Sequence, residues 1–372
     1  MGSVAKRVVM FHPVVSDESI EAVSRIMRDR WIGQGTAVDA FESALREHTG
    51  ACQVVAVSTN SAAVRLALAL SDVGPGSEVI TTPLACTATN HPILEQFATP
   101  VFADIQAGTG TIDPRDVERR ITERTRAIVC YDWGGYPCDL EELSVIAERH
   151  ELALIEDASE ALGATYKSTP VGGIAPFTVL SFQAINIVTT GEGGALCTRN
   201  DDTGQAARAR RWYGIDRRGR RPNEIGYYDF DVISVGYGYH MTNMAAAMGV
   251  ANLDRMDTLV ARRRQIAAQY REAFRSFPGL RLSEEAPDRM SAYHSFTIHV
   301  DRRAEFCTAL RGRGIETSIV HARNDEYSVF GGRRHDLPVL DQFTQSYIAI
   351  PCHPLLTDCE VDQVIESVRG GW

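Results

Sequence analysis

The sequence predicts an α/β protein whose large domain is built on a mostly parallel sheet of seven strands. From residue 54 to about residue 200, short β-branched runs alternate with segments of helical period, which is typical of strands joined by crossover helices. After FPGLRLSEEAPD the pattern changes to a mixture of short strands and helices. We therefore expect a large domain over residues 1–275 and a small α+β domain over residues 276–372.

Seven runs have the composition of buried strands, and helical segments such as SAAVRLALALSD and DLEELSVIAERH lie between them. Because ligands of such a sheet bind beyond the carboxyl ends of the strands, the residues that follow each run are functional candidates. The expected strands cover residues 54–58, 78–82, 101–105, 127–131, 152–157, 178–182 and 194–198.

Beyond residue 201 the sequence predicts a helix rich in Ala and Arg and then a long loop, DRRGRRPNEIGYYDFDVISVGYGYHM. Long loops in compact domains are usually functional or disordered. A continuous helical pattern follows over residues 242–274. In the small domain we expect the strands YHSFTIHV and IETSIV, the helix RRAEFCTALRGR and the final helix TDCEVDQVIESV.

The composition is that of an ordinary globular protein with small-molecule partners. Of 372 residues, 44% are hydrophobic and 23% charged, and the formal net charge is −10, which argues against a nucleic-acid binder or a protein of anionic membranes. No run approaches the roughly 18 to 20 apolar residues of a membrane span. The N-terminal MGSVAKRVVMFHPVVSDES lacks the apolar core of a secretory signal, so we expect a cytoplasmic location.

Two residue types narrow the chemistry further. Eight cysteines are dispersed without a CxxC pair, so we expect reduced, mostly buried thiols rather than disulfides or a metal site. Of the 38 basic residues only Lys6 and Lys167 are lysines. A reaction that needs a buried lysine amine therefore has almost no side chain to use.

Asp157 is the first candidate functional residue. It ends a buried strand in LALIEDASEALGA, where a carboxylate needs a cationic partner to offset its desolvation. A protonated pyridine nitrogen is one such partner. The segment alone is equally compatible with an aspartate that caps the following turn.

Five ordered motifs resemble the DegT/StrS group of sugar aminotransferases, which are fold type I enzymes dependent on pyridoxal phosphate. The motifs are WIGQGTAVDAFESALREHTGA, GPGSEVITTP, EDA…ALGA, SFQA…TTGEGGAL and IAIPCHPLLTDCEVDQVI, and they span nearly the whole chain. The resemblance implies transfer of an amino group from an amino acid such as glutamate to a keto sugar, often nucleotide-linked, or to a keto-cyclitol. Such reactions serve the biosynthesis of deoxyaminosugars, including those of antibiotics.

The resemblance also assigns residues to the cofactor, pyridoxal 5'-phosphate (PLP) or pyridoxamine 5'-phosphate (PMP). Asp157 is expected at the pyridinium nitrogen, which keeps the ring an electron sink. Glu160 stands where the family has Gln or His beside the ring hydroxyl. Ser181 matches the serine that hydrogen-bonds the phosphate, and Gln183 of the same motif is a further cofactor contact.

Two turns are expected to complete the cofactor site. Asn60 and Ser61 stand where the family usually has Gly-Thr, at a predicted helix N-terminus whose free N–H groups suit a phosphate. The same residues would also serve as a plain helix cap. In TTPLACTATNHPIL the family has an aromatic residue that stacks on the ring, and Cys86 is the nearest match here.

The segment VGYGYHMTNMAAAMG resembles a family loop that reaches into the neighbouring subunit. It implies a homodimer with shared active sites. Gly238 stands where a phosphate-binding Asn is usual and His240 where Arg is usual, while Tyr237 is a candidate substrate contact.

Two more segments supply candidate substrate contacts. In SIVHARNDEYSVF these are His321, Arg323 and Asn324, and in YDWGGYPCDL the candidate is Trp133. The alternatives are a solvated loop for the first segment and simple packing of the turn for the second.

Asn186 marks the principal departure from the family. It occupies the place of the Schiff-base lysine in SFQAINIVTTGEGG, with the flanking register intact. An amide forms no imine with the cofactor aldehyde and does not shuttle a proton. Lys6 and Lys167 lie in the N-terminal segment and a hairpin-like turn, so neither is expected to substitute.

Three explanations remain open for Asn186. A deliberate substitution would stop turnover and let an external aldimine accumulate. A natural lysine-less branch, as in the related sugar 3-dehydratases, would bind PLP or PMP without a covalent link and would need another base, such as His240 or His321. A non-catalytic member would bind a cofactor or ligand as a sensor or partner subunit.

Overall fold

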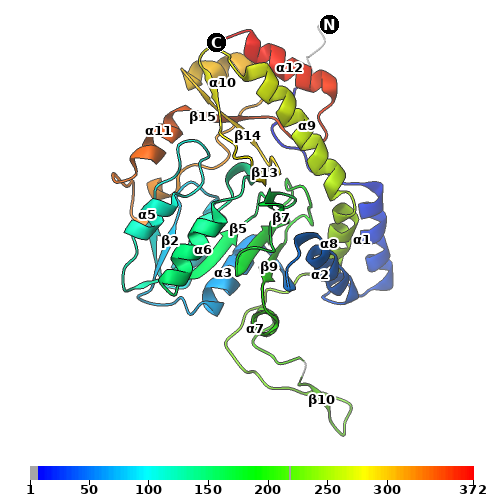
Figure 1. Cartoon of the computed structure of the whole chain (residues 1–372). Coiled ribbons are helices and arrows are strands. Elements are labelled where there is room, and N and C mark those ends of the chain that lie inside the picture. Colours follow the sequence, from blue (N-terminus) through cyan, green and yellow to red (C-terminus); the bar gives the residue numbers. More distant parts are fainter. Residues whose placement is uncertain (1–6, 218) are drawn as a thin grey trace.

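The computed structural model describes residues 7–217 and 219–372. Its centre is a sheet in the order β1-β9-β8-β5-β4-β2-β3 (Figure 1). Only β9 runs antiparallel to its neighbours, β1 and β8, and the pairs β8–β5, β5–β4, β4–β2 and β2–β3 are parallel. The expected mostly parallel, seven-stranded sheet is confirmed. Its strands are β1 (Gln53–Val57), β2 (Glu78–Thr81), β3 (Thr99–Phe102), β4 (Thr125–Tyr131), β5 (Ala153–Asp157), β8 (Phe177–Ser181) and β9 (Gly194–Thr198).

Helices cover both faces of this sheet because its strand residues alternate between two hydrophobic cores. Val55 and Val57 pack in one core with α3, whereas Val54 and Ala56 pack in another with α2 and α8. The helices of the body are α1 (Asp17–Asp29), α2 (Thr36–Thr49), α3 (Asn60–Leu70), α4 (Thr87–Glu95), α5 (Pro114–Arg119), α6 (Leu140–Arg149), α7 (Asp201–Arg211) and α8 (Asn243–Leu253).

The continuous helix expected over residues 242–274 is wrong in one respect. The structure has two helices there, α8 and α9 (Met256–Phe274). At the break, Arg255 N bonds to Asn252 O three residues back, so the α-helical ladder is interrupted although the apolar period continues. Helix α9 joins two cores, because Leu259 packs with the body and Tyr270 with the C-terminal segment.

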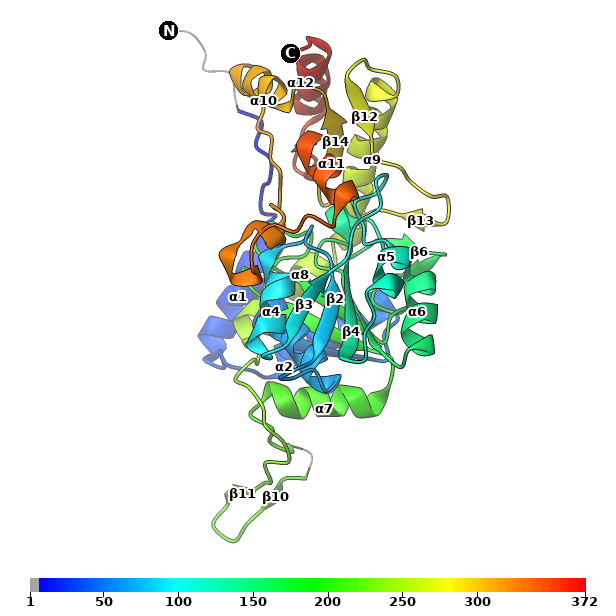
Figure 2. The same cartoon turned by 90° about the vertical axis from the view of Figure 1, so that its left-hand side faces the viewer.

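The C-terminal segment forms its own layer at one end of the sheet (Figures 1 and 2). It holds the sheet β12 (Leu280–Leu282), β14 (Phe296–Val300) and β15 (Tyr347–Ile350), with α10 (Arg303–Gly312), α11 (Pro338–Ser346) and α12 (Asp358–Arg369). The expected strand IETSIV is not formed. Its residues make only single bridges, Val8 to Ile315 and Ser318 to Ala349, because Val320 has a left-handed φ of 53° that ends extended pairing.

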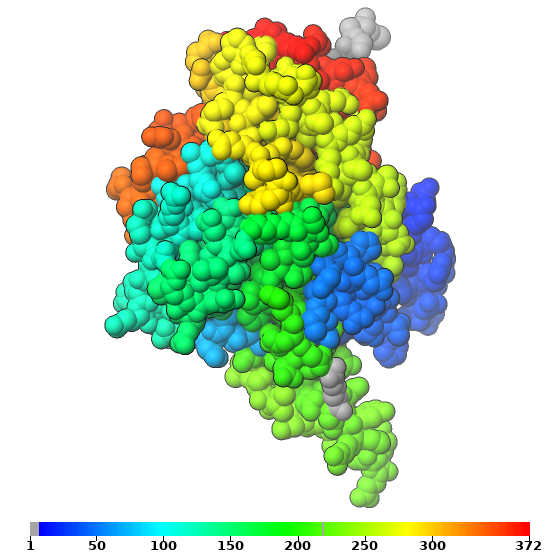
Figure 3. Space-filling view, in the orientation of Figure 1, coloured from blue at the N-terminus to red at the C-terminus, as the bar shows by residue number. Residues whose placement is uncertain are grey.

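The Gly-, Arg- and Tyr-rich segment is an extended hairpin that projects from the opposite end of the molecule (Figures 1, 2 and 3). Its strands are β10 (Arg221–Pro222) and β11 (Tyr228–Asp229). A second hairpin, β6 (Thr165–Tyr166) and β7 (Thr169–Pro170), pairs with β13 (Arg289–Met290) and confirms the turn expected around Lys167.

All eight cysteines are free, as expected. Four of them are buried, two are half-buried and two, Cys52 and Cys359, are exposed. Among the described residues, none of the helices combines the length and the apolar character that crossing a membrane requires.

One buried carboxylate of the body anchors the C-terminal segment. Asp104 accepts hydrogen bonds from Val339 N at 2.9 Å and Leu340 N at 2.8 Å, at the start of α11. Leu337, the N-cap residue of this helix, offers no side-chain cap. Asp104 therefore caps a helix that is distant in sequence and holds it over the sheet.

We expect Asp104→Ala to lower the free energy of unfolding by about 1–3 kcal/mol, because two buried N–H groups lose their acceptor. The measurement is urea unfolding at pH 7. Asp113→Ala is the matched control, because Asp113 caps only its own helix, α5, through an exposed hydrogen bond from Arg115 N. Equal losses in the two variants would contradict the anchoring role.

Candidate active site

Asp157 lies buried at the carboxyl end of β5. It accepts hydrogen bonds from Thr89 Oγ1 at 2.7 Å, Ser159 N at 3.1 Å and Asn60 Nδ2 at 3.3 Å, and from Ser159 Oγ. Burial raises the pKa of Asp157, while these hydrogen bonds act in the opposite direction. No described residue forms an ion pair with it. The hydrogen bond from Ser159 N is the turn cap that the sequence also allowed. The Asp157 carboxylate has no cationic partner among the described residues.

The start of α3 differs from the expected phosphate cup. The N-cap residue is Thr59, whose Oγ1 accepts from Ala62 N at 3.1 Å. The side-chain amide of Asn60 points toward Asp157, and its Nδ2 also donates to Ser159 Oγ at 2.6 Å. The Asn60 Oδ1 atom is buried and has no hydrogen-bond partner among the described residues. Ser61 is half-buried, with Oγ 3.4 Å from Ala88 O. Asn60 therefore positions Asp157 rather than presenting its side chain freely to a ligand.

Strand β9 approaches this helix start closely. A Cβ on Gly194 would lie 2.5 Å from Thr59 O and 2.7 Å from Asn60 N. A Cβ on Gly193 would lie 2.3 Å from Thr190 Oγ1. Gly194 therefore lets the strand pass beside the turn that leads into α3, and Gly193 lets the preceding turn close on Thr190.

The turn after β8 carries Ser181, Gln183 and Asn186. Asn186 is buried, donates from Nδ2 to Ser181 O at 3.0 Å, and bonds through its backbone N to Gln183 O at 2.9 Å. Gln183 is exposed, and its Oε1 accepts from Ile185 N at 3.1 Å. Asn186 thus closes the turn. Lys167 is remote from it, exposed and paired with Glu141, and Lys6 lies outside the described residues.

Glu160 is the second buried carboxylate of the site. Its Oε2 accepts from Gly134 N at 2.8 Å, and Oε1 lies 3.0 Å from His321 Nε2 and 3.5 Å from His294 Nε2. Burial would raise the pKa of Glu160, but the two histidines and Gly134 outweigh it and lower the pKa to about 2. Burial also lowers the pKa of His294 to about 4, so His294 is neutral at pH 7. His321 and the Gly134 N–H then support the Glu160 charge.

Tyr131 and Cys86 connect the two carboxylates. Tyr131 OH lies 3.2 Å from His321 Nε2, and burial raises the pKa of Tyr131, so its hydroxyl stays protonated. Burial also raises the pKa of the Cys86 thiol, and the negative charges of Asp157 and Glu160 add to this shift. The thiol of Cys86 is therefore near enough to both acids to be influenced by their charges. We call Tyr131, Glu160, His294 and His321 the Glu160 cluster.

The loop that carries His321 is fixed to the body by Asn324, in the short turn η2 (Asn324–Glu326). Asn324 Nδ2 donates to Ala85 O at 2.9 Å, and its Oδ1 accepts from Asn90 Nδ2 at 3.0 Å. Arg323 is buried and is bound by both oxygens of Asp325 at 2.7 Å and by Asp341. Both expected substrate contacts thus have internal partners. They position His321 instead.

Tyr237, Gly238 and His240 share no hydrogen bond, ion pair or ring contact with Asp157 or the Glu160 cluster in the described chain. Tyr237 stacks on Tyr239 and lies under the Arg65 guanidinium. The ring of His240 packs against Trp212 at 4.1 Å, and Gly238 bridges to the same residue.

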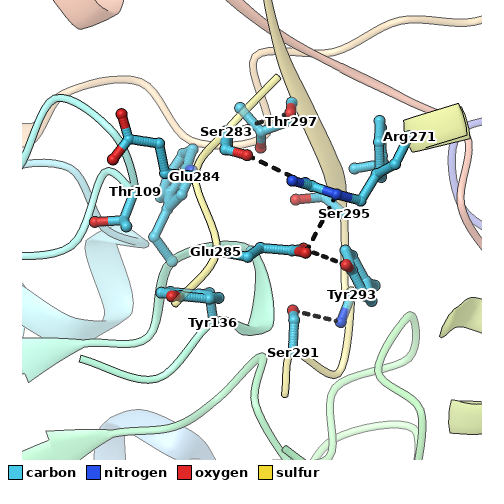
Figure 4. A pocket seen from close by; sticks show the side chains of 13 residues that line it. Thr109, Tyr136, Arg271, Ser283, Glu284, Glu285, Ser291, Tyr293, Ser295 and Thr297 are labelled. Atoms are coloured by element: carbon cyan, nitrogen blue, oxygen red, sulfur yellow. Dashed lines mark hydrogen bonds and ion pairs between the residues drawn. The ribbon is translucent and has the colours of Figure 1, made fainter. Parts of the chain in front are cut away.

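Trp133, in the turn η1 (Trp133–Gly135), contacts the Glu160 cluster and also lines a pocket under the C-terminal segment. Figure 4 shows this pocket. The ring of Trp133 packs edge-on against His321. The pocket holds about 40 Å³, far below the roughly 300–1,000 Å³ of small-molecule sites, so it does not admit a sugar. Arg271, which Ser283 O and Glu285 hold, lies at its side.

Four residues of the site escaped the sequence-based prediction, and one of them is Tyr131, whose hydroxyl lies 3.2 Å from His321 Nε2. Thr89 and Ser159 hold Asp157, and His294 faces Glu160. Ser159 lies inside the EDASE segment that the sequence analysis singled out, and it could have been predicted as a turn residue that bonds to Asp157. Thr89 and His294 come from separate elements, and no local pattern distinguishes a buried His before a strand from a packing residue.

Gly135 is needed for this arrangement. Its φ is +88°, and a Cβ there would lie 2.7 Å from Glu160 O and 3.0 Å from His294 N. We expect Gly135→Ala to lower the free energy of unfolding by about 2–4 kcal/mol through backbone strain and this clash. Chemical unfolding measures it, with Gly74→Ala as the control because an added Cβ there meets nothing within 4 Å. Matching midpoints for the two variants would refute the constraint.

Comparisons with known proteins agree with this architecture. SpsC, the spore coat polysaccharide biosynthesis protein of Bacillus subtilis (strain 168), is 35% identical over 96% of this chain and 95% of its own length. The sugar aminotransferase CalS13 from Micromonospora echinospora superposes with a TM-score of 0.93 at 33% identity, covering 98% of this chain and all of its own. Spr1654 from Streptococcus pneumoniae in its PMP form gives 0.90 at 26% identity, covering 98% of this chain and 97% of its own.

The sequence also matches one protein family over residues 13–369, and that family is PLP-dependent. The fold is accordingly that of fold type I PLP-dependent sugar aminotransferases, as expected. On both grounds the chain belongs to the DegT/DnrJ/EryC1/StrS aminotransferase family.

Proposed function

We propose that this protein binds PLP or PMP without a covalent link and acts on an amino or keto sugar, with Asn186 at the place of the family's Schiff-base lysine. The observation that carries the proposal is Asp157. A buried carboxylate with four donors and no cation among the described residues fits a protonated pyridine nitrogen. Bound there, the cofactor supplies an electron sink for bond cleavage at the amine-bearing carbon.

The other residues of the proposed cofactor site surround Asp157. Ser181 and the N-terminus of α3, with Ser61, hold the phosphate, and Gln183 and Asn60 border it. The proposed partner of the ring face is Cys86, whose thiol is influenced by the charges of both acids, and the proposed partner of the ring hydroxyl is Glu160. Since the one lysine among the described residues, Lys167, pairs with Glu141, these contacts are proposed to hold the cofactor by charge and hydrogen bonds alone.

The substrate is proposed to be a keto sugar, nucleotide-linked, or a keto-cyclitol, with an amino acid such as glutamate as the donor. CalS13 is a sugar aminotransferase and SpsC serves spore coat polysaccharide biosynthesis, which supports a carbohydrate substrate and a role in deoxyaminosugar or antibiotic biosynthesis. Trp133, which packs edge-on against His321, and His321 itself are the proposed substrate contacts beside Glu160. A cytoplasmic location is part of the proposal.

The functional unit is proposed to be a homodimer with shared active sites. The hairpin that projects from the body exposes Ile225 by 88%, Val235 by 85% and Tyr227 by 62%, more apolar surface than an isolated hairpin normally presents to water. Tyr237, Gly238 and His240 follow on the same segment. Since they do not join the cluster of their own chain, their proposed place is the partner's site.

Without a lysine amine at position 186, the chain is not a Schiff-base transaminase. Amino transfer is the ancestral reaction, and the second candidate is loss of water from a keto sugar by a lysine-less enzyme. The Glu160–His321 contact favours turnover over a purely ligand-binding role, because it supplies an imidazole next to the proposed ring site.

The test is Asn186→Lys, with Asn186→Gln as the matched control. We expect the unaltered chain and Asn186→Gln to bind PLP with the spectrum of the free aldehyde, and Asn186→Lys to develop the absorbance of an internal aldimine. Asn186→Lys is also expected to aminate a keto sugar with glutamate. Failure of Asn186→Lys to bind PLP covalently would refute the placement of residue 186.

The dehydratase candidate has its own measurement. The unaltered chain is incubated with PMP, glutamate and a nucleotide-linked 4-keto sugar, and the mass of the sugar product is measured by mass spectrometry. Loss of one water supports that candidate, and an unchanged sugar rejects it.

A further inference from the structure

Turnover without a lysine requires another group to hold a proton at the reacting carbon. Three histidines are candidates, and their surroundings differ. His294 is enclosed and neutral, with its ring against Phe11. His240 packs on Trp212, and its pKa is lowered by burial and by Arg211 and Arg217. Neither has both an ionised partner within hydrogen-bond distance and an accessible ring.

His321 has both features. Its side chain is 23% exposed, and its Nε2 lies 3.0 Å from the buried carboxylate of Glu160. An ionised carboxylate only accepts hydrogen bonds, so in the neutral imidazole Nε2 carries the ring hydrogen and Nδ1 carries the lone pair. Nδ1 has no hydrogen-bond partner in the part of the chain that the structure describes.

The neighbours of His321 leave it as the single base of the cluster. Cys86 is held as a neutral thiol, since burial raises its pKa, and Tyr131 as a neutral phenol, since burial raises its pKa. Asn186 is an amide bonded to its own turn. Among the described side chains near the two carboxylates, His321 alone combines a free lone pair with partial exposure.

We propose that His321 is the proton carrier of this site and that Glu160 and Tyr131 are its positioning residues. This inference rests on the proposed non-covalent binding of PLP or PMP. With the cofactor bound, its ring system would supply the electron sink for the C–H bond that breaks at the reacting carbon, and His321 Nδ1 would accept the proton. The resulting imidazolium is stabilised through Nε2–H by Glu160, and the same proton returns from Nδ1 in the reverse step.

Proton exchange on PMP tests the inference without the unknown sugar. The protein is incubated with PMP in deuterated buffer, binding is measured by ultrafiltration, and deuterium at the 4'-methylene is measured by mass spectrometry of the released PMP. We expect exchange by the unaltered chain. We expect a loss of about 10²-fold or more in His321→Gln with binding retained, in line with the usual contribution of a general base.

The control variant is His91→Gln, because His91 is exposed on α4 and takes no part in the site. His321→Ala is expected to regain exchange when imidazole is added, which a merely structural role would not produce. Exchange by His321→Gln at the rate of His91→Gln, with PMP bound, would overturn the inference and leave the proposed cofactor binding intact.

A cofactor-free readout covers the remaining outcome. In ¹⁵N NMR spectra of the protein alone, His321 is expected as the Nε2–H tautomer, and Glu160→Gln is expected to shift the tautomer balance. If the unaltered chain fails to retain PMP, the proposed function is refuted. In that case the NMR spectra decide the His321 inference separately. An Nδ1–H tautomer refutes it, whereas an Nε2–H tautomer supports the hydrogen bond to Glu160 on which it is based.

Discussion

A carboxylate buried at the end of β5 without a cation is the constraint on which the rest of the site depends. Burial disfavours the charge of Asp157, and the four hydrogen bonds it accepts only partly replace water. The residues that supply these bonds come from α3, α4 and the turn after β5. Three elements are therefore oriented toward one charge, which is the basis for the proposed cationic ligand.

Three residues further along, Glu160 meets the opposite environment. It lies beside imidazoles and a backbone N–H, which lower its pKa to about 2 although burial acts against them. Its partners come from the turn after β4 and from two parts of the C-terminal segment, His294 and the loop of His321. One short segment thus carries an acid suited to a cationic ligand and an acid suited to orienting a histidine. Asp104 and Asn324 hold the C-terminal segment in the position that this second role requires.

Local patterns in the sequence were sufficient for the sheet and for the residues at the strand ends, because buried parallel strands and glycine-dependent turns leave strong local signals. The break between α8 and α9 was hidden because the apolar period crosses it. The strand expected near residue 318 failed because Val320 adopts a left-handed φ. Arg323 and Asn60 resembled ligand contacts until their partners, Asp325 and Asp157, were known. The Asn60–Asp157 pairing joins segments that are 97 residues apart, and a single sequence carries no local trace of it.

The central claim is that the cofactor is held at this site with no bond to a lysine. Borohydride reduction of the protein mixed with PLP, followed by intact-mass and peptide analysis, tests it directly because reduction fixes any imine permanently. The account predicts that the chain retains its unmodified mass and that the cofactor is recovered free. Stoichiometric phosphopyridoxyl modification of Lys6 or Lys167 would contradict it.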